Sequence, residues 1–172
     1  RNLAGSLSGR PDGDQEALDL ELRDDPRARE LHGRAAVANA RIAYQAYERL
    51  LDSDRWRRLA ELGAHPQRPL WASTGVKNPA YPDIMYVTAL VAPDTVNTMP
   101  GATLEAFADH GYVVGDTIRE RYGDARGLLA ELHGVGIDLD QVTAQLEQEG
   151  LSKFEHSWRQ LGETVSGALQ PA

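Results

Sequence analysis

The sequence of 172 residues contains no cysteine, only two lysines and no long apolar run. Without cysteine, the chain has neither a disulfide framework nor a thiolate site, which fits the reducing cytoplasm. No apolar stretch approaches the ~20 residues that a membrane-spanning helix requires. The first residues, Arg1–Ser6, carry one charge and are followed by no apolar run, so we expect no signal peptide and a cytoplasmic location.

The charge balance is acidic, with a formal net charge of −8. This balance argues against nucleic acid as a partner, because nucleic-acid binding requires a cationic surface. Eight arginines are nevertheless dense within residues 27–58, with acidic residues interleaved among them. We interpret this segment as a solvated helical face rather than a binding patch.

Apolar spacing and punctuation residues predict a helix-rich chain with two clear strands. Residues 68–73 and 93–100 are predicted as strands, because apolar and β-branched residues lie between prolines there. Starts at Asp138 and at Ser152, the latter with Glu155 in a capping-box pattern, predict two separate final helices. The expected helices are residues 15–22, 27–52, 54–62, 83–90, 101–110, 117–133, 138–149 and 152–166.

Helices and strands alternate in the middle of the chain, which is typical of α/β architecture with a parallel sheet. A possible third strand lies in the first few residues. The length suits one domain. Two or three parallel strands are few for an ordinary parallel sheet, because open edges and an uncovered apolar face would remain.

Polar residues follow the first strand in the order Ser73, Thr74, Gly75 and Lys77. Ligands of parallel α/β folds lie beyond the carboxyl ends of strands. Two hydroxyls, exposed amides near the glycine and an ammonium group form a candidate phosphate cradle. A capped turn with a solvated lysine explains the same residues. A Schiff-base role for Lys77 is less favoured, because its polar neighbours stabilise the charged ammonium.

Other chemistry-bearing residues give no site. The five histidines have no metal-ligand spacing, and "DGD" (12–14) lacks the remaining oxygen ligands of a calcium loop. We therefore expect no metal site. "HGVGID" (133–138) is not a dinucleotide fingerprint, because no strand precedes it and the glycine spacing differs. The four aromatic residues interpreted as core are Tyr44, Tyr47, Trp71 and Trp158.

Several longer strings resemble the carboxy-terminal half of transaldolase in its actinobacterial form. They are "GRAAVANARIAYQAYERL" (33–50), "QRPLWASTGVKNPAYPDIMYV" (67–87) and "APDTVNTMPGATLEAFADHG" (92–111), and "GIDLDQVTAQLEQEGLSKFEHSW" (136–158) continues the match. The resemblance covers about residues 30–166, whereas residues 1–29 match loosely.

The resemblance implies part of a (β/α)8 TIM barrel, about strands six to eight with their helices, plus C-terminal helices. On this comparison 1–172 is a single incomplete domain, in which residues 68–73 form the seventh strand and 94–99 the eighth. Transaldolases transfer a dihydroxyacetone unit from sedoheptulose 7-phosphate to glyceraldehyde 3-phosphate in the pentose phosphate pathway, through a lysine Schiff base and without a cofactor. The loops after strands six and seven bind the substrate phosphate, a role that Ser73 and Lys77 match. Arg10 is a further phosphate-binding candidate, although its neighbours depart from the family pattern.

The catalytic lysine of the family lies on the fourth strand, and neither Lys77 nor Lys153 stands at a matching place. On this comparison the chain has no catalytic residue of its own and is inactive alone. Three explanations remain open: a fragment, a split gene product completed by a partner chain or by self-association, and a degenerate protein. The last would be a non-catalytic module that binds sugar phosphates or another protein. The family also implies a tail, residues 117–166, that folds back over the barrel.

Overall fold

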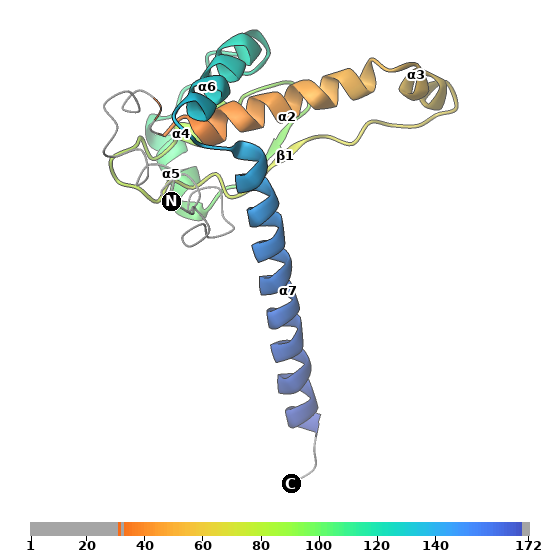
Figure 1. Cartoon of the computed structure of the whole chain (residues 1–172), viewed down its shortest axis with the longest axis vertical. Coiled ribbons are helices and arrows are strands. Elements are labelled where there is room, and N and C mark those ends of the chain that lie inside the picture. Colours follow the sequence, from red (N-terminus) through yellow and green to blue (C-terminus); the bar gives the residue numbers. More distant parts are fainter. Residues whose placement is uncertain (1–30, 32, 170–172) are drawn as a thin grey trace.

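The computed structural model describes residue 31 and residues 33–169 as a small helical body from which one long helix extends (Figure 1). The predicted helix 15–22, the possible first strand and Arg10 lie outside the described residues. No helix among the described residues is both long and apolar enough to cross a membrane. The elements in chain order are α2 (Ala35–Leu51), α3 (Asp54–Glu61), β1 (Leu70–Trp71), α4 (Met85–Ala89), β2 (Val96–Asn97), α5 (Gly101–His110), η2 (Arg119–Arg121), α6 (Tyr122–Gly134) and α7 (Leu139–Leu169).

The predicted strands are confirmed as a parallel pair of two residues each. Leu70 is opposite Val96, and Trp71 is opposite Asn97. The amide of Val96 donates to the carbonyl of Pro69, and the amide of Thr98 to that of Trp71, both at 2.9 Å. Parallel strands require a crossover, and α4 lies within the connection between them.

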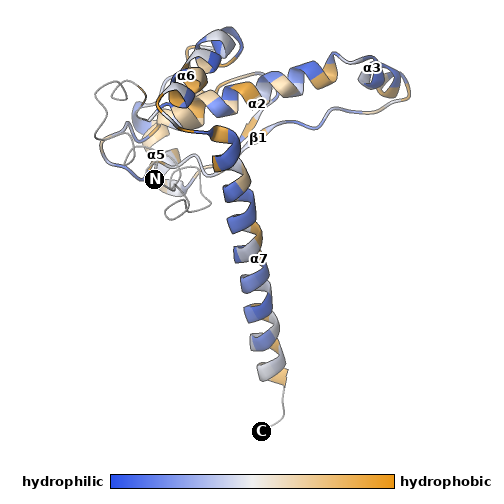
Figure 2. Ribbon diagram, in the orientation of Figure 1, coloured by the Kyte–Doolittle hydropathy of each residue, from blue (hydrophilic) through white to orange (hydrophobic). Residues whose placement is uncertain are grey.

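Helix α2 is buried on two sides because small and apolar residues recur along it (Figure 2). One side joins a cluster with α6 and the start of α7, formed by Leu31, Ala35, Ala38, Ala125, Leu128, Leu132, Ile137 and Val142. The other side joins a cluster with α4 and β1, formed by Val37, Tyr44, Tyr86, Leu90 and Ile118, with Trp71 packed against it. The described body therefore has two apolar clusters that share α2.

Most predicted helix ends are close to those observed. Helix α5 spans Gly101–His110 as expected, and Asp138 caps α7 by accepting the amides of Asp140 and Gln141 at 3.0 and 3.2 Å. The N-cap of α3 is Ser53, one residue before the predicted helix start at residue 54, because the Ser53 hydroxyl accepts the amide of Trp56 at 3.2 Å.

Two predicted helices begin later than expected. Helix α2 begins at Ala35 rather than near residue 27, because the chain turns at Gly33, whose φ is 70°. Helix α6 begins at Tyr122 rather than at residue 117, because the short helix η2 precedes it.

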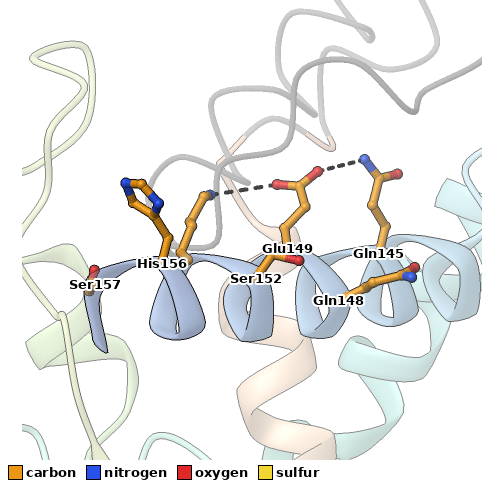
Figure 3. A pocket seen from close by; sticks show the side chains of 7 residues that line it. Gln145, Gln148, Glu149, Ser152, His156 and Ser157 are labelled. Carbon is orange, nitrogen blue, oxygen red and sulfur yellow. Dashed lines mark hydrogen bonds and ion pairs between the residues drawn. The ribbon is translucent and has the colours of Figure 1, made fainter. Parts of the chain in front are cut away.

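The prediction of two final helices is wrong, because α7 continues through Gly150 and Ser152. Side chains spaced four residues apart bridge the glycine. Gln145 donates to Glu149 at 2.8 Å, and Lys153 forms an ion pair with Glu149 at 3.6 Å (Figure 3). Pairs at this spacing each stabilise a helix by a few tenths of a kcal/mol, and they partly offset the cost of ~1 kcal/mol that an internal glycine imposes.

Only the first part of the tail, residues 117–166, packs on the described body; the fold-back over a barrel stays a prediction, because the described residues form only two strands. Helix α6 packs on α2, whereas α7 extends away from the other elements (Figure 1). Trp158, predicted to be core, lies on this extension with 75% of its surface exposed. Tyr44 is buried, and Tyr47 and Trp71 pack against the same cluster, as predicted.

Candidate functional site

The candidate site is the loop that leaves β1 at Ala72 and runs to Asn78. Because β1 and β2 are parallel, their carboxyl ends meet at one edge. The β1 loop therefore emerges beside the segment that leads from β2 into α5. Ligands of parallel sheets bind beyond such an edge. The pairing of β1 with β2 therefore places the candidate residues where a ligand of this fold class would bind.

Thr74 anchors this loop. Only 3% of its surface is exposed. Its hydroxyl donates a hydrogen bond to the side-chain oxygen of Asn97 at 2.7 Å, and the carbonyl oxygen of Thr98 is a second acceptor at 3.2 Å. A single hydroxyl proton directed at these acceptors is not available to a ligand. The interpretation of Thr74 as part of a phosphate cradle is therefore wrong, and its role is to hold the loop against β2.

Gly75 lies close to the start of α5. A Cβ atom at this position would be 2.9 Å from Cγ of Pro100 and 3.4 Å from the Thr103 hydroxyl. The first of these distances is shorter than van der Waals contact allows. Gly75 therefore permits the two loops at the rim to approach each other.

Ser73 has an unusual backbone conformation and an exposed side chain. Its φ is 56°, in the left-handed region that residues other than glycine rarely occupy. Such a conformation costs about 1 kcal/mol or more and persists only where surrounding contacts hold it. The buried Thr74 that follows supplies such a contact.

Lys77 is exposed at the far end of the loop. Beyond it, Asn78 fixes the next turn, because its side-chain oxygen accepts the amide of Ala80 at 3.0 Å and its carbonyl accepts that of Tyr81 at 3.1 Å. Ser73 and Lys77 are thus two exposed polar residues on one loop. Thr74 fixes this loop between them, and Asn78 fixes it directly after Lys77. The third candidate, Arg10, lies outside the described residues.

Asn97 is the residue at this rim that sequence reasoning missed. Asparagine is disfavoured in strands, so its position inside "DTVNTM" was a signal for a specific hydrogen bond. The structure supplies that bond through Thr74. Among the described residues, no group of three or more histidine, aspartate or glutamate side chains could hold a metal ion.

A hollow of about 190 Å³ lies between α2, α4 and α6, and Arg41 is among the residues that line it. The Arg41 side chain is half-buried rather than solvated as predicted, and one of its Nη atoms donates to the carbonyl of Ala89 at 3.4 Å. Its pKa is lowered, first by burial and then by the positive charge of Arg121. This hollow is away from the rim, and none of the candidate residues lines it.

Comparisons with known proteins place the chain in a family. The model of the family described as transaldolase/fructose-6-phosphate aldolase matches residues 14–165. The chain is 58% identical over 147 residues to a transaldolase of Parafrankia sp., covering 86% of this chain and 40% of the relative. It is 57% identical over 153 residues to that of Renibacterium salmoninarum, covering 89% of this chain and 41% of the relative.

A transaldolase of Frankia alni is 51% identical over 168 residues, covering 98% of this chain and 45% of the relative. The chain thus spans less than half the length of these curated relatives. The family model, in contrast, covers most of this chain. The chain belongs to the transaldolase/fructose-6-phosphate aldolase family.

Proposed function

We propose that residues 68–100 form the phosphate-binding part of a transaldolase site, in which a dihydroxyacetone unit moves from sedoheptulose 7-phosphate to glyceraldehyde 3-phosphate. The observation that carries this proposal is the parallel register of β1 and β2, which brings the loop of Ser73 and Lys77 to the carboxyl edge of the pair. On this proposal β1 and β2 are barrel strands seven and eight.

Ser73 and Lys77 supply complementary chemistry for a phosphate. An ammonium group provides positive charge and three donors, and a hydroxyl adds a further donor. Both side chains are exposed on a loop whose backbone is held by the Thr74–Asn97 hydrogen bond. A loop held in advance loses less conformational entropy when an anion binds. Arg10 is kept as a third phosphate ligand on the strength of the family comparison.

The carbon-transfer chemistry requires an amine that this proposal does not assign to either lysine of the chain. Lys153 is on α7, paired with Glu149 and distant in sequence from the rim. Lys77 is assigned to phosphate. We therefore propose that the Schiff-base lysine belongs to the part of the relatives that this chain does not match. That part is present either as a preceding segment or as a partner chain.

Borohydride trapping tests this division of roles. The chain is mixed with fructose 6-phosphate and sodium borohydride, and its mass is measured by mass spectrometry. We expect no covalent adduct and no transaldolase turnover, because no amine here is assigned as nucleophile. An adduct on Lys77 would overturn its assignment to phosphate.

A chimaeric enzyme tests phosphate binding directly. The chain is joined in register to the preceding part of the Parafrankia transaldolase, and Lys77→Ala is compared with Lys153→Ala, which removes the only other lysine. Loss of a charged hydrogen bond of about 1.5–3 kcal/mol predicts a roughly 10- to 150-fold higher KM for phosphorylated substrates. Lys153→Ala is expected to leave KM unchanged. Equal KM values for Lys77→Ala and the parent would remove Lys77 from the site.

A further inference from the structure

Tyr44 is a side chain of α2 that contacts both strands of the rim. It is buried, with 2% of its surface exposed. Its ring centre lies 6.5 Å from that of Trp71, the last residue of β1. Its hydroxyl donates to the carbonyl of Pro93 at 3.1 Å, and Pro93 stands three residues before β2. One side chain therefore fixes β1 by its ring and the approach to β2 by its hydroxyl.

The contact between Tyr44 and Trp71 is one of packing. The indole Nε1 of Trp71 is enclosed and has no hydrogen-bond partner within the part of the chain that the structure describes. Because this Nε1 is the only polar atom of the side chain, the position of Trp71 depends on the apolar cluster that contains Tyr44. Trp71 leads directly into the loop of Ser73 and Lys77. The ring of Tyr44 therefore helps to fix where that loop begins.

The hydroxyl of Tyr44 is held in one direction. Nη2 of Arg119 donates to it at 3.4 Å, and the guanidinium carbon of Arg119 lies 5.9 Å from the ring centre. Arg119 is in turn held by Glu48, which accepts its Nε at 2.7 Å. Because arginine carries only donors, the single proton of the phenol is left for the carbonyl of Pro93. The hydrogen bond to Pro93 therefore has a defined direction.

The chain between Pro93 and the rim has little slack. On the other side of Pro93, the amide of Val91 donates to the hydroxyl of Thr117 at 2.9 Å, and the amide of Thr117 donates to the carbonyl of Val91 at 2.8 Å. Toward the rim, only residues 94–96 separate Pro93 from Asn97. We therefore expect a shift of Pro93 to move Asn97 as well.

The position of Asn97 in turn controls the conformation of the rim loop. Its side-chain oxygen accepts the hydroxyl of Thr74 at 2.7 Å. Ser73, directly before Thr74, has a φ of 56°, which persists only where surrounding contacts maintain it. If Asn97 shifts, the bond to Thr74 lengthens and Ser73 relaxes toward an ordinary backbone conformation. The direction of the Ser73 hydroxyl relative to Lys77 then changes.

We propose that Tyr44 is a positioning residue for phosphate binding, which keeps β1 and β2 in the register that directs Ser73 and Lys77 at one anion. This inference rests on the proposed function of the rim loop. Tyr44 is buried and does not touch the phosphate, so it acts through Trp71 and through Pro93. A tyrosine with a purely structural role would contribute to stability and leave the affinity for phosphate unchanged.

An NMR titration of the full chain with fructose 6-phosphate tests the proposal. The amide chemical shifts of Ser73, Gly75 and Lys77 give the dissociation constant. Tyr44→Phe removes only the hydroxyl and is expected to raise this constant about 2- to 30-fold, the range for residues coupled to a site without touching its ligand. Tyr47→Phe is the matched control, because it removes a hydroxyl from α2 but not the bond to Pro93, and it is expected to change nothing.

Thr74→Val separates positioning from a structural role. In that variant the bond that links Asn97 to the loop is already lost. Adding Tyr44→Phe is therefore expected to cause no further loss of affinity, although it still lowers the free energy of unfolding measured with urea. Equal losses of affinity in both backgrounds, or an unchanged dissociation constant in Tyr44→Phe, would overturn the proposal.

Lys77→Ala distinguishes a failure of this proposal from a failure of the proposed function. If Lys77→Ala weakens binding and Tyr44→Phe does not, the assignment of Lys77 to phosphate stands and Tyr44 is only a core residue. If Lys77→Ala leaves binding unchanged, or if the rim amides of the wild type do not respond to the sugar phosphate, the assignment of the rim to phosphate fails and this proposal fails with it.

Discussion

The hydroxyl of Thr74 and the side-chain oxygen of Asn97 lie 2.7 Å apart, joining the first residues after β1 to the last residue of β2. The strand register places Asn97 opposite Trp71, so this bond continues the pairing of the strands beyond their backbone hydrogen bonds. A two-residue strand pair alone has few hydrogen bonds. This side-chain bond, which is partly buried, is therefore a main reason why the rim loop has a defined position.

Thr74→Val removes this bond while keeping the shape of the side chain. Because the oxygen of half-buried Asn97 then loses its donor, we expect the free energy of unfolding to fall by about 1–3 kcal/mol. Chemical denaturation with urea measures the change. Thr98→Val is the matched control, because Thr98 is exposed and its hydroxyl has only a 3.5 Å contact with the carbonyl of Trp71. Equal stability of both variants would contradict the assigned role of Thr74.

The rim shows how far sequence reasoning reaches. The two strands were predictable because prolines and β-branched residues bound them, and their parallel pairing followed from the helix between them. The role of Thr74 could not be predicted from the sequence, because a hydroxyl group after a strand can bind a ligand or a buried acceptor equally well. That choice depends on Asn97, which is 23 residues away in sequence.

Helix α7 shows the opposite limit. Ser152 and Glu155 form a capping-box pattern after Gly150, and local rules therefore predicted a break. The observed helix continues through Gly150, and the bonds from Glu149 to partners on both sides of the glycine offset part of its cost. Trp158 was interpreted as a core residue and is exposed, since sequence periodicity reveals an apolar face but not what covers it.

His110 is the last residue of α5 and lies between two carboxylates. Its Nε2 is 3.0 Å from Asp83 and its Nδ1 is 3.2 Å from Asp109. The hydrogen bond with Asp83, and then that with Asp109, raises the pKa of His110. Because the folded state favours the charged ring, its contribution to stability is present below about pH 6.5 and is lost as the pH rises through the raised value.

We therefore expect Asp83→Asn to lower the pKa of His110 toward that of a free histidine. Chemical shifts of the ring protons, followed by NMR against pH, measure this change. Asp109→Asn is the matched comparison and is expected to lower the pKa by less. If the ring titrates at the same pH in Asp83→Asn and in the wild type, the contact between α5 and the segment before α4 does not persist in solution.

Tyr122 begins α6 and donates its hydroxyl hydrogen bond to Glu48 of α2, which also accepts Nε of Arg119 at 2.7 Å. Burial, followed by the hydrogen bond to Glu48, raises the pKa of Tyr122 above its usual value of about 10. The folded protein keeps this phenol protonated where the unfolded chain ionises it. The resulting stability is present below about pH 10 and is lost as the pH rises toward the folded-state pKa.

Absorbance of tyrosinate in the near ultraviolet tests this prediction in the wild type and in Tyr122→Phe. Under native conditions near pH 10–11 the two proteins are expected to ionise the same number of tyrosines, because Tyr122 contributes none. In denaturant the variant is expected to ionise one fewer. The stability of the wild type is also expected to fall more steeply than that of Tyr122→Phe above pH 10, since only the wild type releases this proton on unfolding. A native difference approaching one tyrosine near pH 11 would show that Glu48 and Tyr122 do not hold α2 and α6 together in solution.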